Sequence, residues 1–209
     1  KALSERAKIC YHPTFFVLML GSGVHSIYYA LQMPISYDEA WTFLNFTSRG
    51  ILSSILYYPA PNNHVLHSIL TNLTYLLPLD ITLALRLPTI LANLLWIFIM
   101  YSFLYEYGSR NLAFSVTALC SFLFMSVYYS YMSRGYCLNN LFFVLVTYSS
   151  FKIANSINNR YAWIVYSVCS ILGFYTVPTF MYPFAAVNIF MLIYVRGVLL
   201  SLFRFNFII

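Results

Sequence analysis

Long apolar runs dominate this chain and restrict the folds that are open to it. A hydrocarbon core about 30 Å thick needs roughly 20 apolar residues in a helix. The short alternating segments that are typical of a membrane β-barrel are missing from the sequence. We therefore predict an all-α fold, a polytopic transmembrane helical bundle with about six spans. The predicted spans are residues 15–33, 81–105, 112–131, 136–153, 161–177 and 179–194.

The composition agrees with a membrane location and argues against nucleic acid as a partner. Hydrophobic residues make up 61% of the chain and charged residues only 8%. The net charge is +6, but the basic residues are dispersed between the apolar runs. This dispersal indicates the positive-inside bias of a membrane protein, with lipids as its partners. The four cysteines show no paired spacing, so neither a disulfide framework nor a thiolate metal site is expected.

Residues 34–80 differ from the rest because they concentrate polar groups. Two of the five acidic residues, Asp38 and Glu39, are adjacent here. A carboxylate at bilayer depth costs about 2.5–3.5 kcal/mol on insertion scales, so we expect both at the water interface. The amphipathic pattern of residues 36–58 predicts a helix lying in that interface, and residues 62–77 form a second candidate. The segment is thus predicted to be a long outer loop with interfacial juxtamembrane helices.

Charge placement favours an interfacial position for residues 62–77 over a transmembrane one. With this assignment the positive-inside rule is satisfied, and Arg49, Arg86 and Arg134 lie outside. We predict one transmembrane domain over residues 1–209, integral and multi-pass, in a bacterial plasma membrane with its active face non-cytoplasmic. The basic residues then on the inner side are Lys1, Arg6, Lys8, Arg110, Lys152, Arg160, Arg196 and Arg204.

Asp38 and Glu39 are the first candidates for chemistry. Neighbouring residues on a helix point in different directions, so the two carboxylates are expected to have separate roles. A carboxylate that is partly shielded at a membrane surface can act as general base toward a hydroxyl or an amine. The alternative is that the two acids only begin an interfacial helix, where negative charge is favourable.

Asn63, His64 and His67 form the second candidate group. The two histidines are three residues apart, so they share one face of a helix. They could orient a substrate or bind a divalent metal together with Glu39, although that carboxylate is distant in sequence. The alternative is that they are polar residues decorating an interfacial helix.

Arg134 and Arg86 are candidate phosphate-binding residues. Both are predicted to lie at the outer ends of spans, on the same side as Asp38. A guanidinium fixed there could bind a phosphate held at the membrane surface. The alternative is that each is a snorkelling anchor, which is common at span ends.

Four segments, taken in chain order, resemble motifs of one enzyme family. In that family the corresponding segments are an Asp-Glu motif in the first outer loop, a His-Pro-Pro-Leu type segment, an Arg-Leu-Pro-Ser segment, and a Ser-Arg segment between the third and fourth spans. The segments here are Tyr37-Asp38-Glu39-Ala40, Pro61-Asn62-Asn63-His64-Val65-Leu66, Leu85-Arg86-Leu87-Pro88-Thr89 and Tyr131-Met132-Ser133-Arg134-Gly135-Tyr136. With these segments the chain resembles the N-terminal part of the GT-C glycosyltransferases, in the branch of the protein mannosyltransferases and the lipid A aminoarabinose transferase.

The resemblance covers about residues 15–151 and implies a function. It implies a membrane enzyme that moves a sugar from a polyprenyl-phosphate donor to a protein, lipid or glycan acceptor. Asp38 would be the catalytic base, beside Glu39. The resemblance implies that Arg134, together with Tyr136, lies near the donor phosphate. We also assign Arg86 to donor-phosphate binding, and Tyr37, Asn63 and His64 to the binding of acceptor or substrate.

Departures from the family pattern bear on metal binding and on the extent of the enzyme. His64 is followed by Val65 and Leu66 instead of Pro-Pro-Leu, and Gly135 replaces the usual proline. No acid follows in that loop, which argues against metal-dependent donor binding. If a divalent metal binds at all, we expect Glu39 and His64 among its ligands. The family generally has more spans than these. The alternative function is a non-catalytic membrane transporter or a structural subunit.

Overall fold

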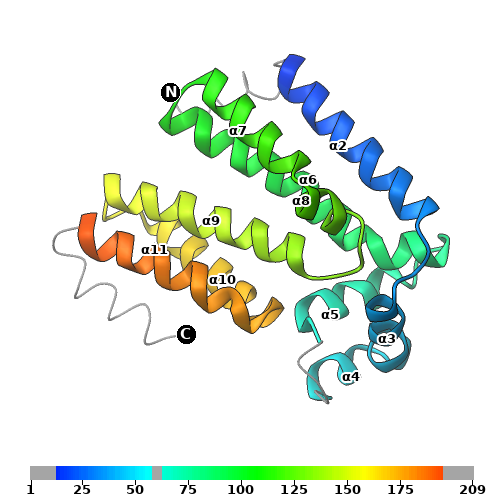
Figure 1. Cartoon of the computed structure of the whole chain (residues 1–209). Coiled ribbons are helices and arrows are strands. Elements are labelled where there is room, and N and C mark those ends of the chain that lie inside the picture. The colour runs from blue at the N-terminus through cyan, green and yellow to red at the C-terminus, as the bar shows by residue number, and fades with distance from the viewer. Residues whose placement is uncertain (1–12, 58–62, 195–209) are drawn as a thin grey trace. The chain divides into compact units, whose positions relative to one another are not determined.

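The computed structural model describes residues 13–57 and 63–194. This part of the chain is helical and contains no strand (Figure 1). The predicted all-α fold class is therefore confirmed for the described residues.

Three of the described helices are long and apolar enough to cross a membrane. They are α2 (Pro13–Gln32), α6 (Ile81–Tyr107) and α9 (Tyr136–Asn155). Their bounds lie within two residues of the spans predicted at residues 15–33, 81–105 and 136–153. The sequence pattern thus located these helices correctly.

The other three predicted spans correspond to shorter helices. The segment at 112–131 forms α7 (Arg110–Phe122) and α8 (Phe124–Tyr129), which are separated where Leu123 adopts an extended backbone. The last two correspond to α10 (Arg160–Thr176) and α11 (Met181–Tyr194). Membrane crossing by these segments, and with it the six-span topology, stays a prediction.

The prediction of one continuous amphipathic helix over residues 36–58 is wrong. The segment forms α3 (Tyr37–Asn45), the short 3-10 helix η1 (Thr47–Arg49) and α4 (Ile51–Leu56). The break before α4 lies at Gly50, whose φ of 88° and ψ of 173° belong to a region that L side chains rarely adopt. The second candidate helix, predicted at residues 62–77, is observed as α5 (Val65–Thr74).

The described chain divides into two compact units, Lys1–Leu138 and Asn139–Ile209. In the first unit α2 packs along α6, and α6 also packs against α5 and α7 (Figure 1). Asn93 of α6 donates hydrogen bonds to Ser22 and Ser26 of α2, at 3.1 and 3.4 Å. Such bonds between apolar helices are a common means of association where no water competes. This division into units does not test the predicted single transmembrane domain over residues 1–209, which stays a prediction.

The second unit is held by aromatic packing. The short helix η2 (Pro178–Phe180) connects α10 to α11, and its Phe180 is fully buried. A Cβ atom at Gly173 would come within 2.6 Å of the Phe180 ring, so the glycine makes room for it. Phe151 of α9 stacks on Phe190 of α11 with ring centroids 4.9 Å apart.

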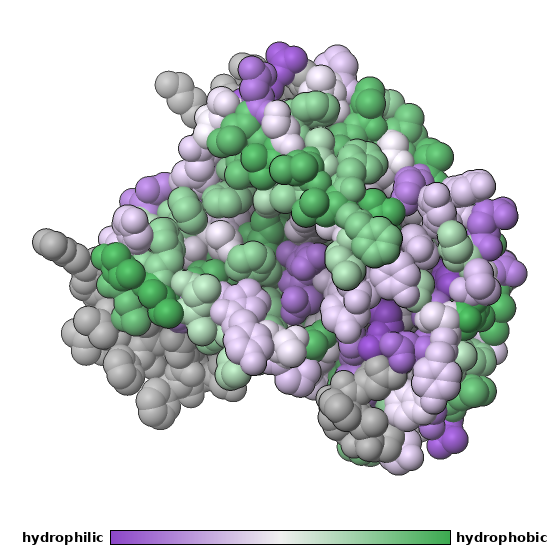
Figure 2. Space-filling model, in the orientation of Figure 1, coloured by the Kyte–Doolittle hydropathy of each residue, from purple (hydrophilic) through white to green (hydrophobic). Residues whose placement is uncertain are grey.

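The surface of the first unit separates apolar from polar regions. Figure 2 shows apolar residues over α7 and α8, and more hydrophilic residues where α3 and α5 lie. Exposed apolar side chains also follow one face of α2 at helical spacing, as expected for a helix in contact with lipid. They are Phe16, Leu20, Val24, Ile27 and Leu31.

Candidate functional site

A buried ion pair between Glu39 and Arg86 fixes the framework of the site. Nε and Nη2 of Arg86 donate to the two carboxylate oxygens of Glu39, both at 2.9 Å, and both side chains are 1% exposed. Glu39 lies in the first turn of α3. The Ser36 hydroxyl accepts from the Glu39 backbone N–H, and the Glu39 carboxylate accepts from the Ser36 N–H. This capping box and the ion pair together hold the start of α3 against α6.

The contacts of Arg86 differ from those expected of a phosphate-binding residue. Besides Glu39, its guanidinium donates to the carbonyl oxygens of Ala30, Met33 and Pro34, at 2.8 to 3.0 Å. All five N–H donors of the guanidinium therefore have protein acceptors. Arg86 therefore joins the end of α2 to α3, and we expect no phosphate to bind it.

Glu39 likewise has the contacts of a structural residue. Its Oε1 also accepts the backbone N–H of Ser133 at 2.6 Å, and the Ser133 hydroxyl donates to the Leu85 carbonyl. Burial alone would raise the pKa of Glu39, but hydrogen bonds from Arg86, Ser36 and Ser133 lower it below its usual value. The acid is thus held ionised, and its bonds position the loop that carries Arg134.

Arg134 lies where α3, α5 and this loop meet. Its Nη1 donates to the Thr42 hydroxyl at 3.5 Å, and its Nη2 lies 3.2 Å from Nε2 of His64. The same Nη2 is 4.0 Å from Oδ2 of Asp38. The Arg134 side chain is only 7% exposed, whereas that of Asp38 is 56% exposed. A fixed cation and an accessible carboxylate therefore lie side by side.

His64 presents two ring nitrogens to hydrogen-bond donors. Nδ1 accepts the Gly135 backbone N–H at 2.8 Å, while Nε2 faces the Arg134 guanidinium. Burial, followed by the charge of Arg134 and the neighbouring His67, lowers the pKa of His64 to about 3. The ring is therefore neutral at ordinary pH, and its single proton belongs on Nε2, directed toward Arg134.

His67 holds the backbone of the same loop. Its Nε2 lies 3.0 Å from the Thr89 hydroxyl, which donates to the Arg134 carbonyl oxygen at 3.2 Å. Because Thr89 uses its proton on that carbonyl, Nε2 of His67 must be the donor to Thr89. Burial and Arg134 lower the pKa of His67 to about 3. Both histidines thus support Arg134 from α5.

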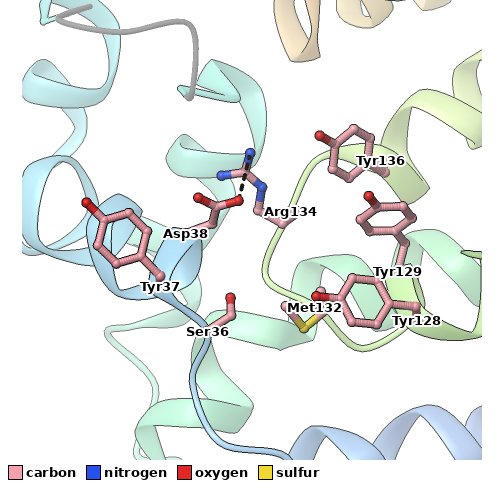
Figure 3. A pocket seen from close by; sticks show the side chains of 8 residues that line it. All are labelled: Ser36, Tyr37, Asp38, Tyr128, Tyr129, Met132, Arg134 and Tyr136. Carbon is pink, nitrogen blue, oxygen red and sulfur yellow. Dashed lines mark ion pairs between the residues drawn. The ribbon is translucent and has the colours of Figure 1, made fainter.

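A cavity of about 270 Å³ opens in front of Asp38 and Arg134 (Figure 3). Tyr136 forms part of its wall, with its ring edge-on to His64 at a centroid distance of 4.9 Å. Tyr37 lies at the rim and is 80% exposed, with its side chain pointing away from the other tyrosines. The full lining is Ser36, Tyr37, Asp38, Tyr128, Tyr129, Met132, Arg134 and Tyr136.

The remaining predicted residue, Asn63, makes structural contacts. Its amide group donates to the Ser54 carbonyl oxygen at 3.0 Å and accepts from the Ser68 hydroxyl at 2.9 Å. The side chain therefore joins α4 to α5 instead of lining the cavity. Among the residues that the structure describes, no three His, Cys, Asp or Glu side chains form a group that could hold a metal ion.

Several contributors to the site escaped the sequence patterns. Tyr128, Tyr129 and Met132 line the cavity, but tyrosines at the end of a span are also explained by an aromatic belt. Thr42 and Thr89 contact Arg134, although the motifs of their helices gave neither residue a role. The position of Tyr128 and Tyr129 just before the Ser133-Arg134-Gly135 segment is the signal that could have identified them.

No protein-family model, curated protein or solved structure matches this chain. The described part of the chain is thus helical, has three helices long and apolar enough to cross a membrane, and places a buried arginine beside an accessible aspartate.

Proposed function

We propose that this protein is a membrane glycosyltransferase that uses a polyprenyl-phosphate-linked sugar, with Asp38 as general base and Arg134 at the donor phosphate. The single observation that supports this most is the 4.0 Å approach of Asp38 to Arg134 in one cavity. The partners are a polyprenyl-phosphate sugar, membrane lipids, and an acceptor protein, lipid or glycan. The active face is the non-cytoplasmic one.

The proposed reaction needs both groups at this spacing. Asp38 removes the proton from the acceptor hydroxyl or amine, and the freed electron pair attacks C1 of the sugar. The bond between C1 and the phosphate oxygen breaks, and that oxygen leaves with the bonding electrons. Arg134 stabilises the negative charge that develops on the leaving phosphate. A lipid-linked donor also explains why the site lies beside apolar helices.

The surroundings of Arg134 support an anionic ligand. The His64 N–H and the Arg134 guanidinium are both donors, yet their nitrogens are 3.2 Å apart. A phosphate oxygen that accepts from both would relieve this contact. A neutral His64 also avoids adding a second positive charge to a buried position.

The experiment that tests this function is a transfer assay with Asp38→Asn. Membranes containing the full-length protein receive labelled polyprenyl-phosphate sugars, and the release of sugar-free polyprenyl phosphate is measured, since every acceptor yields this product. We expect the substitution to lower the rate by about 10²–10⁴-fold, the usual contribution of a general base.

The matched control is Asp80→Asn, which makes the same acid-to-amide change. Asp80 caps the exposed start of α6, and asparagine caps helices about as well as aspartate. This variant is expected to keep the wild-type rate. A wild-type rate in the Asp38→Asn protein would overturn the assignment of the base.

A further inference from the structure

Three tyrosines form one side of the cavity. Tyr128 and Tyr129 end α8, and Tyr136 begins α9. Their rings contact one another: the centroid distance is 4.2 Å between Tyr129 and Tyr136, and 5.2 Å between Tyr128 and Tyr129. All three are half-buried, so each keeps part of its surface open. We refer to Tyr128, Tyr129 and Tyr136 as the tyrosine wall.

The tyrosine wall offers both ring surface and hydroxyl groups to the cavity. Figure 3 shows the phenolic oxygens of Tyr128 and Tyr136 at the ends of the rings nearer Asp38 and Arg134, and that of Tyr129 directed toward Tyr136. A phenol hydroxyl both donates and accepts, and its ring supplies rigid apolar contact area. The matching ligand has hydroxyl groups around its edge and an apolar C–H face. A monosaccharide ring has this chemistry.

We propose that the tyrosine wall binds the glycosyl group of the donor, so that Tyr128 and Tyr129 are sugar-contacting residues. This inference rests on the proposed function, because it takes the donor phosphate to lie on Arg134. The sugar is bonded directly to that phosphate, and therefore it must occupy space next to the guanidinium. Tyr136 already lies there, with the Arg134 guanidinium 5.9 Å from its ring centroid.

The volume of the cavity indicates how many sugar units it can hold. Its volume of about 270 Å³ is just below the usual range for small-molecule sites, roughly 300–1,000 Å³. A single monosaccharide suits this volume better than an oligosaccharide. The acceptor then approaches from the other side of Asp38, where Tyr37 and the carboxylate are exposed. We therefore expect the enzyme to transfer one monosaccharide in each reaction.

The test compares binding of donors with and without the sugar. The full chain in lipid nanodiscs is titrated with short-chain polyprenyl phosphate and with a panel of its hexosyl and pentosyl esters. The gain in affinity on adding the sugar is measured for wild type, Tyr128→Leu, Tyr129→Leu and Tyr129→Phe. Tyr161→Leu is the control, because Tyr161 is 83% exposed and does not line the cavity.

We expect at least one ester to bind wild type tenfold or more tightly than the sugar-free phosphate. Tyr128→Leu and Tyr129→Leu should lose most of this gain in affinity, and Tyr129→Phe should lose part of it. All three variants should bind the sugar-free phosphate as tightly as wild type does. That unchanged binding also shows that the variants fold. The inference is overturned if the variants keep the gain, if they weaken both ligands equally, or if no ester shows a gain.

Failure of the proposed function has a different signature in the same experiment. Arg134→Gln should weaken binding of the sugar-free phosphate by tenfold or more. If this variant binds the phosphate as wild type does, the donor-phosphate assignment fails whatever the tyrosine variants show.

Discussion

Adjacent acids at the start of α3 have opposite environments, and this difference assigns their roles. The Glu39 side chain is 1% exposed and bonded to Arg86, whereas Asp38 is 56% exposed beside the cavity. The sequence pattern predicted separate roles from the angle between neighbouring side chains. It could not tell which acid faces inward, because that depends on Arg86 and Ser133, which bond Glu39 from distant segments.

Replacement of Glu39 by glutamine is expected to destabilise the fold. Removing one charge of a buried pair leaves the other uncompensated, and the usual cost is about 3–5 kcal/mol in the free energy of unfolding. Denaturant unfolding in detergent measures the loss. Glu106→Gln, at an exposed position near the end of α6, should be close to wild type.

The Asp38→Asn substitution, at the neighbouring residue, is expected to leave the fold as stable as wild type. It should leave the free energy of unfolding within about 0.5 kcal/mol of wild type, as is usual for an exposed position. Equal stability of the Glu39→Gln and Asp38→Asn proteins would contradict the division of roles.

The two buried histidines predict a pH dependence of stability. Their pKa values are lowered to about 3, below the ordinary 6.5, so between these values the unfolded chain binds protons that the folded chain does not. The free energy of unfolding should therefore fall as pH drops from 6.5 toward 3, by up to about 1.4 kcal/mol per pH unit for each histidine.

His67→Gln tests this dependence between pH 7 and 5, above the range in which carboxylates titrate. Glutamine can still donate to Thr89, so the variant should fold while the slope of stability against pH becomes shallower. A slope identical to that of wild type would show that His67 is not held neutral by the fold.

At the scale of elements, the sequence located helices better than it located breaks. Apolar runs predicted α2, α6 and α9 within two residues, because length and hydropathy alone mark such segments. The breaks at Leu123 and Gly50 were missed. An amphipathic pattern continues across Gly50, and only the observed positive φ shows that the helix stops there.

Gly50→Ala and Gly21→Ala should have effects of opposite sign. Neither added methyl group would meet an atom within 4 Å, so the backbone conformation alone determines the effect on stability. At Gly50 the strained φ and ψ should cost about 1–3 kcal/mol in the free energy of unfolding. Within α2, alanine should stabilise by about 0.5–1 kcal/mol. Thermal unfolding of both variants checks this, and destabilisation by both would contradict it.

At the scale of the whole molecule, we expect α6 to cross the membrane and α4 to lie at its surface. Leu95 of α6 is 53% exposed and Leu56 of α4 is 79% exposed. Arginine at Leu95 should oppose insertion by about 2.5–3.5 kcal/mol, whereas arginine at Leu56 should cost little at the interface. A membrane-insertion assay with both variants measures this, and equal penalties would contradict the interfacial position of α4.

The candidate site shows the same limit on what a sequence can predict. Motif order suggested that Asp38, His64 and Arg134 belong together, and the structure brings these three into contact. Arg86 and Asn63 carried equally suggestive motifs, yet their polar groups are used by the fold. Hydrogen-bond partners from distant segments decide between a binding residue and a structural one, and no local pattern contains them.

Whether the base and the donor phosphate share one site is tested by the affinity of the Asp38→Asn protein for sugar-free polyprenyl phosphate. If the phosphate binds Arg134 beside Asp38, removing the carboxylate removes a repulsion at about 4 Å, worth roughly 1 kcal/mol at an exposed position. We therefore predict that this variant binds the phosphate about 3- to 10-fold more tightly than wild type, although it transfers sugar about 10²–10⁴-fold more slowly. Unchanged or weaker binding would contradict a shared site for the base and the donor phosphate.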